Sequence, residues 1–124
     1  MNVNDPAIEV IVTEEFEAWY MELDDQDTAA VTRVVGLLEE KGITLGFPYS
    51  SDIKESAIAL RELRIQSRGD PLRVFYRFDP RRHAVLLIGG DKTGDPRFYE
   101  QMISLAERIW RDYLNSIRKE AQKR

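Results

Sequence analysis

The chain has 124 residues, 43% hydrophobic and 32% charged, a composition typical of one folded domain with its own core. It contains no cysteine and one histidine, which excludes disulfide frameworks, thiolate metal sites, cysteine nucleophiles and histidine-based zinc clusters. We therefore expect no metal or other cofactor. Because no apolar run approaches the roughly 20 residues of a membrane span, and the acidic N-terminus is unlike a signal peptide, we expect a cytoplasmic protein.

Charge is unevenly distributed along the chain. The net charge is −4, but residues 1–60 carry 13 acidic and 3 basic side chains, whereas residues 61–97 carry 5 acidic and 9 basic ones. Charges separated by more than a Debye length of about 8 Å are largely screened, so the local balance decides what a surface attracts. The middle of the chain is therefore able to attract an anionic partner.

The first elements expected are a strand and a short helix. Residues 7–12 follow an Asp-Pro turn and are almost all apolar, as in a strand covered on both faces. Thr13 precedes two glutamates, the pattern of an N-cap followed by acids in the first turn. Trp19 and Tyr20 lie on the apolar stripe of this helix, where core packing is the expected role and stacking on a nucleic-acid base is the alternative.

A second helix is expected from about Asp24 to Gly42, where the glycine provides the C-terminal stop. The two helices would then form an αα-hairpin. Residues 43–56 contain two helix-breaking residues and three serines, so they are predicted to be a connection without regular structure. Their length is typical of a functional loop.

Three more strands are expected at about 60–66, 72–78 and 84–90, separated by turns rich in glycine, proline and aspartate. This pattern predicts an antiparallel meander. In the central strand, alternation places Arg73 and Arg77 on the face opposite to most of the apolar residues. Neighbouring guanidinium groups on an open sheet face suit phosphate. The last of the three strands is nearly all apolar, which predicts burial on both sides.

A last helix is expected after the loop at 89–94, which lacks the spacing of a P-loop. Asp95 and Pro96 would supply its N-cap and first-turn proline. Residues 1–6 and 118–124 are expected to be flexible ends of one domain spanning residues 1–124. The element order is therefore β-α-α-β-β-β-α, an α+β fold.

This order and several motifs resemble the RelE/HigB toxin superfamily, most closely its HigB branch with phage-type relatives. The resemblance covers about residues 8 to 114 and implies a mainly antiparallel, twisted four-stranded sheet with an N-terminal helical hairpin and a C-terminal helix. It also implies a toxin of a type II toxin–antitoxin pair. The motifs are LGFPYS at 45–50, LRELR at 60–64, RVFYRFDP at 73–80, AVLLI at 84–88, DKT at 91–93 and PRFY at 96–99.

The resemblance implies specific roles and partners. Arg73 matches the strand arginine that contacts the scissile phosphate, Lys92 the basic residue after the last strand, and Tyr99 the aromatic residue at the start of the last helix. Many members cut mRNA in the ribosomal A site, and such a toxin is neutralised by a helix-turn-helix antitoxin of the HigA kind. The lone His83 begins a strand rather than lying in the following loop, so it is expected to be an ordinary residue. The further arginines expected to bind RNA are Arg61, Arg64, Arg68, Arg77 and Arg97.

RNA cleavage of this kind uses the 2′-hydroxyl as nucleophile, so the protein must accept a proton, stabilise the phosphorane and protonate the leaving oxygen. Arg73 can only stabilise charge. Lys92 or Tyr99 would exchange a proton if nearby cations lowered the pKa of that side chain. We expect Arg73 and Lys92 on one open face of the sheet, where Arg73→Ala would cost less than about 0.5 kcal/mol of stability.

Each assignment has an alternative. Arg73 would otherwise be solvated or paired with a carboxylate such as Glu62, Lys92 would serve the turn, and Tyr99 would pack the last helix. For the whole chain, the alternatives to an endoribonuclease are a ParE-like gyrase inhibitor and a non-catalytic or decayed toxin that still binds an antitoxin.

Overall fold

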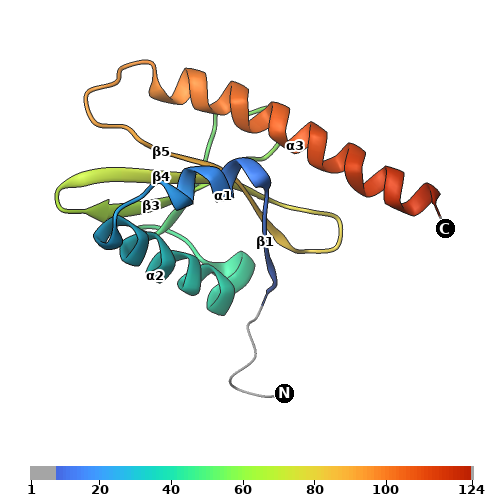
Figure 1. Cartoon of the computed structure of the whole chain (residues 1–124), viewed down its shortest axis with the longest axis horizontal. Helices are drawn as coiled ribbons and strands as arrows, with labels where there is room; N and C mark the ends of the chain where they lie inside the picture. The colour runs from blue at the N-terminus through green and yellow to red at the C-terminus, as the bar shows by residue number, and fades with distance from the viewer. Residues whose placement is uncertain (1–7, 124) are drawn as a thin grey trace.

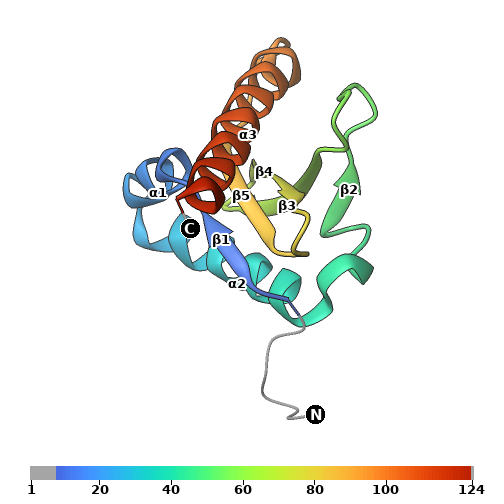
Figure 2. The same cartoon turned by 90° about the vertical axis from the view of Figure 1, so that its right-hand side faces the viewer.

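A five-stranded sheet lies between the two N-terminal helices on one face and the long C-terminal helix on the other (Figure 1). The computed structural model describes residues 8–123. Figure 2 shows the same layers after a quarter turn, with α3 on one side of the sheet and α2 on the other. The elements are β1 (Val10–Val12), α1 (Glu14–Met21), α2 (Asp25–Lys41), the 3-10 turn η1 (Gly42–Thr44), β2 (Ser50–Asp52), β3 (Arg61–Ser67), β4 (Asp70–Phe78), β5 (Ala84–Asp91) and α3 (Phe98–Gln122).

The strand order is β1-β5-β4-β3-β2, and the sheet is mixed. The expected α+β class is confirmed. The expected number of four strands is wrong, because a fifth strand, β2, pairs antiparallel with β3. The segment 50–52 shows no apolar alternation, so only its hydrogen bonds to β3 make it a strand. At the other edge β1 runs parallel to β5, with Val10 opposite Ala84.

The three consecutive strands β3, β4 and β5 form the expected antiparallel meander. Arg68 and Gly69 join β3 to β4, with φ angles of 53° and 86°. Positive φ at both central residues is the geometry of a two-residue turn that matches the twist of the strands. The register between β4 and β5 shifts at Phe75 and Tyr76, which are opposite Ile88 and Leu86.

On one face, α1 packs over β5 and α2 over β3. The predicted Thr13 cap and Gly42 stop are confirmed: the Thr13 side chain accepts the backbone N–H of Phe16, and Gly42 follows the last residue of α2 with φ 59°. Asp24, where the second helix was expected to start, is its N-cap and accepts the backbone N–H of Asp27. The expected αα-hairpin differs in that each helix packs on its own strand of the sheet. Trp19 lies so close to Gly89 that a Cβ there would be 2.3 Å from the indole ring, so its core role is confirmed.

On the other face, α3 covers β4 and β5 with a second apolar cluster that includes Phe75, Leu87 and Trp110. The helix begins at Phe98, two residues later than a first-turn Pro96 would require. Asp95 does not cap the helix; its side chain accepts the backbone N–H of Arg97 within the preceding turn instead. The helix continues to Gln122, through most of the end expected to fray, while residues 1–6 lie outside the described residues.

The turn between β4 and β5 is fastened to α3 by the buried Asp79 carboxylate. This side chain accepts bonds from the backbone N–H groups of Arg81 and His83 and from the Tyr113 hydroxyl, at 2.8 to 3.0 Å. Burial acts to raise the pKa of Asp79, but these hydrogen bonds and the nearby His83 together hold that pKa below its ordinary value. His83 therefore contributes to the turn, through its backbone N–H bond to Asp79 and an imidazole nitrogen 3.3 Å from the same carboxylate.

Between residues 8 and 123, none of the helices has both the length and the apolar content required to cross a bilayer.

Candidate functional site

The candidate site lies on the α3 face of the sheet, where the apolar cluster under the helix gives way to charged residues. Alternation places Arg73 on the same face as Phe75, as expected. That face is not open at Arg73, however, because Glu62 from β3 and Tyr99 from α3 close over the guanidinium, and Arg73 is only 4% exposed. The prediction of Arg73 and Lys92 on one open face is therefore wrong for Arg73.

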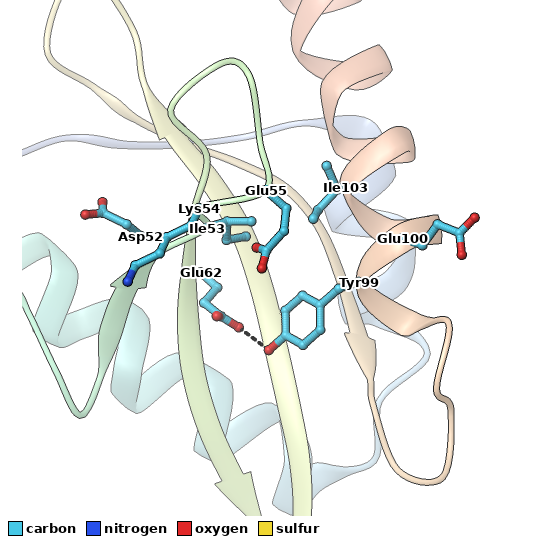
Figure 3. Close-up of a pocket in the computed structure, with 8 residues that line it drawn as sticks. All are labelled: Asp52, Ile53, Lys54, Glu55, Glu62, Tyr99, Glu100 and Ile103. Carbon is cyan, nitrogen blue, oxygen red and sulfur yellow. Dashed lines mark hydrogen bonds between the residues drawn. The ribbon is translucent and has the colours of Figure 1, made fainter.

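The centre of the site is the carboxylate of Glu62, which is 5% exposed. Its Oε1 accepts the hydroxyl of Tyr99 at 2.7 Å, the bond drawn in Figure 3, and lies 3.2 Å from Nε of Arg73. Arg73 also donates from a terminal nitrogen to the carbonyl of Leu72. The alternative in which Arg73 pairs with Glu62 across the strands is thus the arrangement found.

The second oxygen of Glu62 faces two further polar side chains. The hydroxyl of Ser51 donates to Oε2 at 3.3 Å, and a terminal nitrogen of Arg64 lies 3.8 Å from the same oxygen. Sequence reasoning treated Glu62 only as a partner for Arg73 and did not name Ser51. The alternation of β3 carried the signal for Glu62, since it places Glu62 and Arg64 on one face, whereas Ser51 enters the site only through β2.

The Tyr99 hydroxyl is the hydrogen-bond donor to Glu62 in this site. Burial is the main cause that raises the pKa of its phenol, the hydrogen bond to Glu62 raises it further, and Arg73 opposes both effects only in part. The expectation that neighbouring cations would lower this pKa is therefore wrong, because the nearest charged partner is a carboxylate. The ammonium of Lys92 lies 5.3 Å from the centre of the Tyr99 ring, a cation–π contact that brings Lys92 to the edge of the site.

Of the further arginines, only Arg64 belongs to this site. Arg61 is on the opposite face of β3, where it bonds to the Tyr76 hydroxyl and to Ser50 and pairs with Asp52. The remaining three lie elsewhere: Arg68 pairs with Asp24 and Asp27 at the start of α2, Arg77 stacks over Trp110, and Arg97 pairs with Glu100.

A cavity of about 610 Å³ opens between Tyr99 and the segment that follows β2 (Figure 3). Its wall holds four carboxylates and a single lysine, so it is acidic. Nowhere in residues 8–123 do three potential metal-ligating side chains converge. The lining residues are Asp52, Ile53, Lys54, Glu55, Glu62, Tyr99, Glu100 and Ile103.

The site thus combines a proton acceptor, a proton donor and positive charge. The Glu62 carboxylate is the acceptor, the Tyr99 phenol is the donor, and Arg73 forms an ion pair with the carboxylate. Arg64 and Lys92 lie on either side, each partly exposed. Such a set can move a proton and attract an anion at one place.

A family model described as phage-derived protein Gp49-like (DUF891) matches residues 18–111, which include every site residue named above. The chain is 37% identical over 109 residues to the candidate toxin HigB3 of Mycobacterium tuberculosis, a match covering 86% of this chain and 94% of that protein. It is 32% identical over 104 residues to the candidate toxin HigB2 of the same organism, covering 82% of this chain and 52% of that protein. The chain therefore spans nearly all of the first relative and about half of the second.

Proposed function

The chain belongs to the Gp49-like family of phage-derived proteins and is a HigB-type toxin of a toxin–antitoxin system, and we propose that it acts as a ribosome-dependent mRNA endoribonuclease. The observation that supports this activity is the Glu62 carboxylate, held within hydrogen-bond distance of both the Tyr99 phenol and the Arg73 guanidinium. An acceptor, a donor and positive charge at one place are the groups that cleavage through a 2′-hydroxyl requires.

The proposed roles follow from the chemistry of each side chain. Glu62 accepts the proton of the 2′-hydroxyl, and Tyr99, a phenol that is protonated at neutral pH, donates a proton to the leaving 5′-oxygen. Arg64 and Lys92 are the more exposed cations and meet the phosphate. Arg73 was expected to contact the scissile phosphate; because it is buried behind Glu62, we assign it the positioning of that carboxylate instead.

This site is closed on itself before a substrate arrives. The acceptor and the donor are bonded to each other at 2.7 Å, so both must turn toward the RNA before either can act. A reaction of this kind depends on something that holds the RNA in place, since orientation supplies much of the barrier lowering in enzymes. The ribosomal A site is the proposed source of that alignment, and mRNA the proposed substrate.

The similarity to HigB toxins also implies that this chain has an antitoxin partner. We propose an antitoxin of the HigA kind, a helix-turn-helix protein, as the partner that neutralises this chain in the cytoplasm. The relatives named above support a toxin–antitoxin pair, and the helix-turn-helix character of the partner rests on the resemblance alone.

A second candidate is a non-catalytic toxin that keeps only antitoxin binding. Two observations favour it: the guanidinium of Arg73 is already paired with Glu62, and the adjacent cavity is lined by four carboxylates, which repel RNA phosphates. The first candidate still accounts better for the partly exposed Arg64 and Lys92 beside Glu62 and Tyr99. Gyrase inhibition is the remaining alternative, and it predicts damage to DNA rather than to mRNA.

The test is brief induction of the toxin in cells, followed by mapping of mRNA ends and a DNA supercoiling assay. We expect cleavage ends within coding regions and unchanged supercoiling. Glu62→Gln should slow cleavage by about a hundredfold or more, the usual contribution of a general base. Glu100→Gln is the matched control, because it makes the same charge change in the wall of the same cavity without touching Arg73 or Tyr99.

Two results would contradict the proposal. Growth arrest without new mRNA ends, or with gyrase-linked DNA breaks, would remove the endoribonuclease. Cleavage by Glu62→Gln at the rate of the unaltered protein would remove Glu62 as the base. If Glu62→Gln is poorly folded by circular dichroism, Tyr99→Phe provides the second test, since a proton donor at this position predicts a comparable loss of rate.

A further inference from the structure

We propose that the ring of Phe47 and the guanidinium of Arg64 form a stacking platform for one nucleobase of the RNA, beside the Glu62 centre. This inference rests on the proposed function and extends it to Phe47, a residue outside the acid–base centre. Phe47 is 78% exposed, the highest value among the exposed large hydrophobic side chains of residues 8–123. The two hydrophobic clusters of the protein do not include it.

The segment that carries Phe47 is anchored at both ends. Leu45 and Ser50 are buried on either side of it. Between them the backbone closes a tight turn, in which the N–H groups of Tyr49 and Ser50 both donate to the carbonyl of Gly46 at 3.1 Å. The exposure of the ring is therefore a property of a fixed turn. An apolar side chain held in water this way costs free energy unless something covers it.

The platform is attached directly to the proposed acid–base centre. The Cζ atom of Arg64 lies 5.4 Å from the centre of the Phe47 ring, a cation–π contact. A terminal nitrogen of the same guanidinium is 3.8 Å from Glu62, and the backbone N–H of Arg64 donates to the carbonyl of Tyr49 at 2.8 Å. A base on the platform would thus be one side chain away from the proposed general base.

Two aromatic rings and two cations are linked to the Glu62 carboxylate by a series of contacts. Each member contacts the next in the series. Sites for single-stranded RNA have this composition, since bases stack on aromatic rings and guanidinium planes while cations hold the phosphates. The order across the surface is Phe47, Arg64, Glu62, Tyr99 and Lys92.

An exposed phenylalanine would also serve as an anchor for a protein partner. RNA is favoured here because the ring is paired with a guanidinium next to the proposed cleavage site. The other strongly exposed apolar side chains, Met21 and Ile43, are aliphatic and offer no ring on which a base can stack. Ile43 lies in the connection that leads to Phe47, which makes it a suitable control position.

The experiment measures base stacking directly and does not depend on cleavage. The probe is an RNA of about eight nucleotides, within the usual site size of single-strand binders, fully 2′-O-methylated so that it has no nucleophile and carrying 2-aminopurine at each position in turn. The protein is mixed with this RNA free in solution and, in a second format, with ribosomes that hold the RNA as mRNA with the 2-aminopurine in the A site. We expect the full-length protein to quench 2-aminopurine at one position, and Phe47→Ala to weaken that binding roughly tenfold to a hundredfold.

Two variants make the result specific. Phe47→Trp should restore quenching, because a larger ring also stacks, whereas Ile43→Ala should behave like the unaltered protein. Equal quenching by the unaltered protein and by Phe47→Ala, or no quenching in either format, would overturn the platform. Full RNA binding by Phe47→Ala combined with loss of neutralisation by the antitoxin would show a protein anchor, and would also overturn it.

The two proposals fail separately. If the unaltered protein cleaves no mRNA but its quenching of 2-aminopurine still requires Phe47, the platform stands and the endoribonuclease is wrong. If the protein cleaves mRNA, and Phe47→Ala cleaves with unchanged KM and unchanged quenching, the endoribonuclease stands and the platform is wrong.

Discussion

The two faces of the sheet are covered in different ways. Beneath α1 and α2 the strands contribute a continuous apolar surface, and residues such as Leu63, Val74 and Leu86 are almost completely buried. Beneath α3 the apolar cluster formed with β4, β5 and the segment before β3 is interrupted by the buried charges of Glu62 and Arg73. The candidate site therefore lies where one face changes from apolar to charged.

A difference in width explains the contrast. Five strands at about 4.8 Å spacing span roughly 20 Å, whereas one helix with its side chains is only about 10–12 Å across. Two helices can cover the first face, but α3 alone cannot cover the second. Near the start of α3, Glu62 on β3 is covered by Tyr99 of that helix and pairs with Arg73 of β4. A substrate would reach this buried carboxylate only after Tyr99 turns away from it.

The largest effect that would test this contrast is the loss of Arg73. We expect Arg73→Ala to lower the free energy of unfolding by about 3–5 kcal/mol, because it leaves Glu62 as a buried charge without its partner. The expectation of less than about 0.5 kcal/mol applied to a surface arginine, and the burial of Arg73 makes it wrong. Urea denaturation measures the difference. A loss below about 1 kcal/mol would mean that water reaches Glu62.

The double variant Arg73→Met with Glu62→Gln provides the control for that measurement. Removing both charges avoids the unpaired carboxylate, so its loss of stability should be clearly smaller than that of Arg73→Ala.

A smaller effect is expected from Gly89, which tests how tightly the apolar face is packed. A Cβ at this position would be 2.3 Å from the ring of Trp19, so Gly89→Ala should cost about 1–3 kcal/mol through overpacking. Gly90 faces α3, and its Cβ would be 2.9 Å from Phe98, so Gly90→Ala should cost less. The melting temperatures of the two variants, measured by thermal unfolding, compare how tightly the two faces are packed.

Gly36 is the matched control for these alanine variants. It lies in the middle of α2, and no neighbouring side chain or strand comes within 4 Å of the position that an alanine methyl would take. Gly36→Ala should therefore stabilise the protein by about 0.5–1 kcal/mol, the usual gain of alanine over glycine inside a helix. A destabilising Gly36→Ala, or a neutral Gly89→Ala, would contradict the packing described for this face.

The smallest effect concerns the pH dependence of Tyr99. Since its pKa is raised in the folded protein, its contribution to stability is complete below the ordinary tyrosine pKa of about 10 and is lost as the pH rises through the folded value. Urea denaturation at pH values on both sides of about 10 should show this loss, and Tyr99→Phe should reduce it. If the free energy of unfolding falls with pH equally steeply in Tyr99→Phe, the phenol is not buried against Glu62.

The sequence by itself determined much of the fold. Alternation in β4 correctly placed Arg73 on the face that also carries Phe75, because successive side chains of a strand point to opposite sides. The capping residue Thr13 located the start of α1, and Gly42 located the end of α2, for an equally local reason. The strand β2 was missed, since Ser50, Ser51 and Asp52 have no strand pattern and are ordered by their neighbour.

Only the tertiary structure decided the character of the site. Sequence identified Arg73 and Tyr99 as candidates, but not that Glu62 lies between them or that Arg73 is buried. The upward shift of the Tyr99 pKa also depends on the fold, because its causes, burial and the Glu62 carboxylate, arise from the way α3 packs near β3. Local spacing sets which way a side chain points, whereas burial and charge pairing depend on segments that meet only after folding.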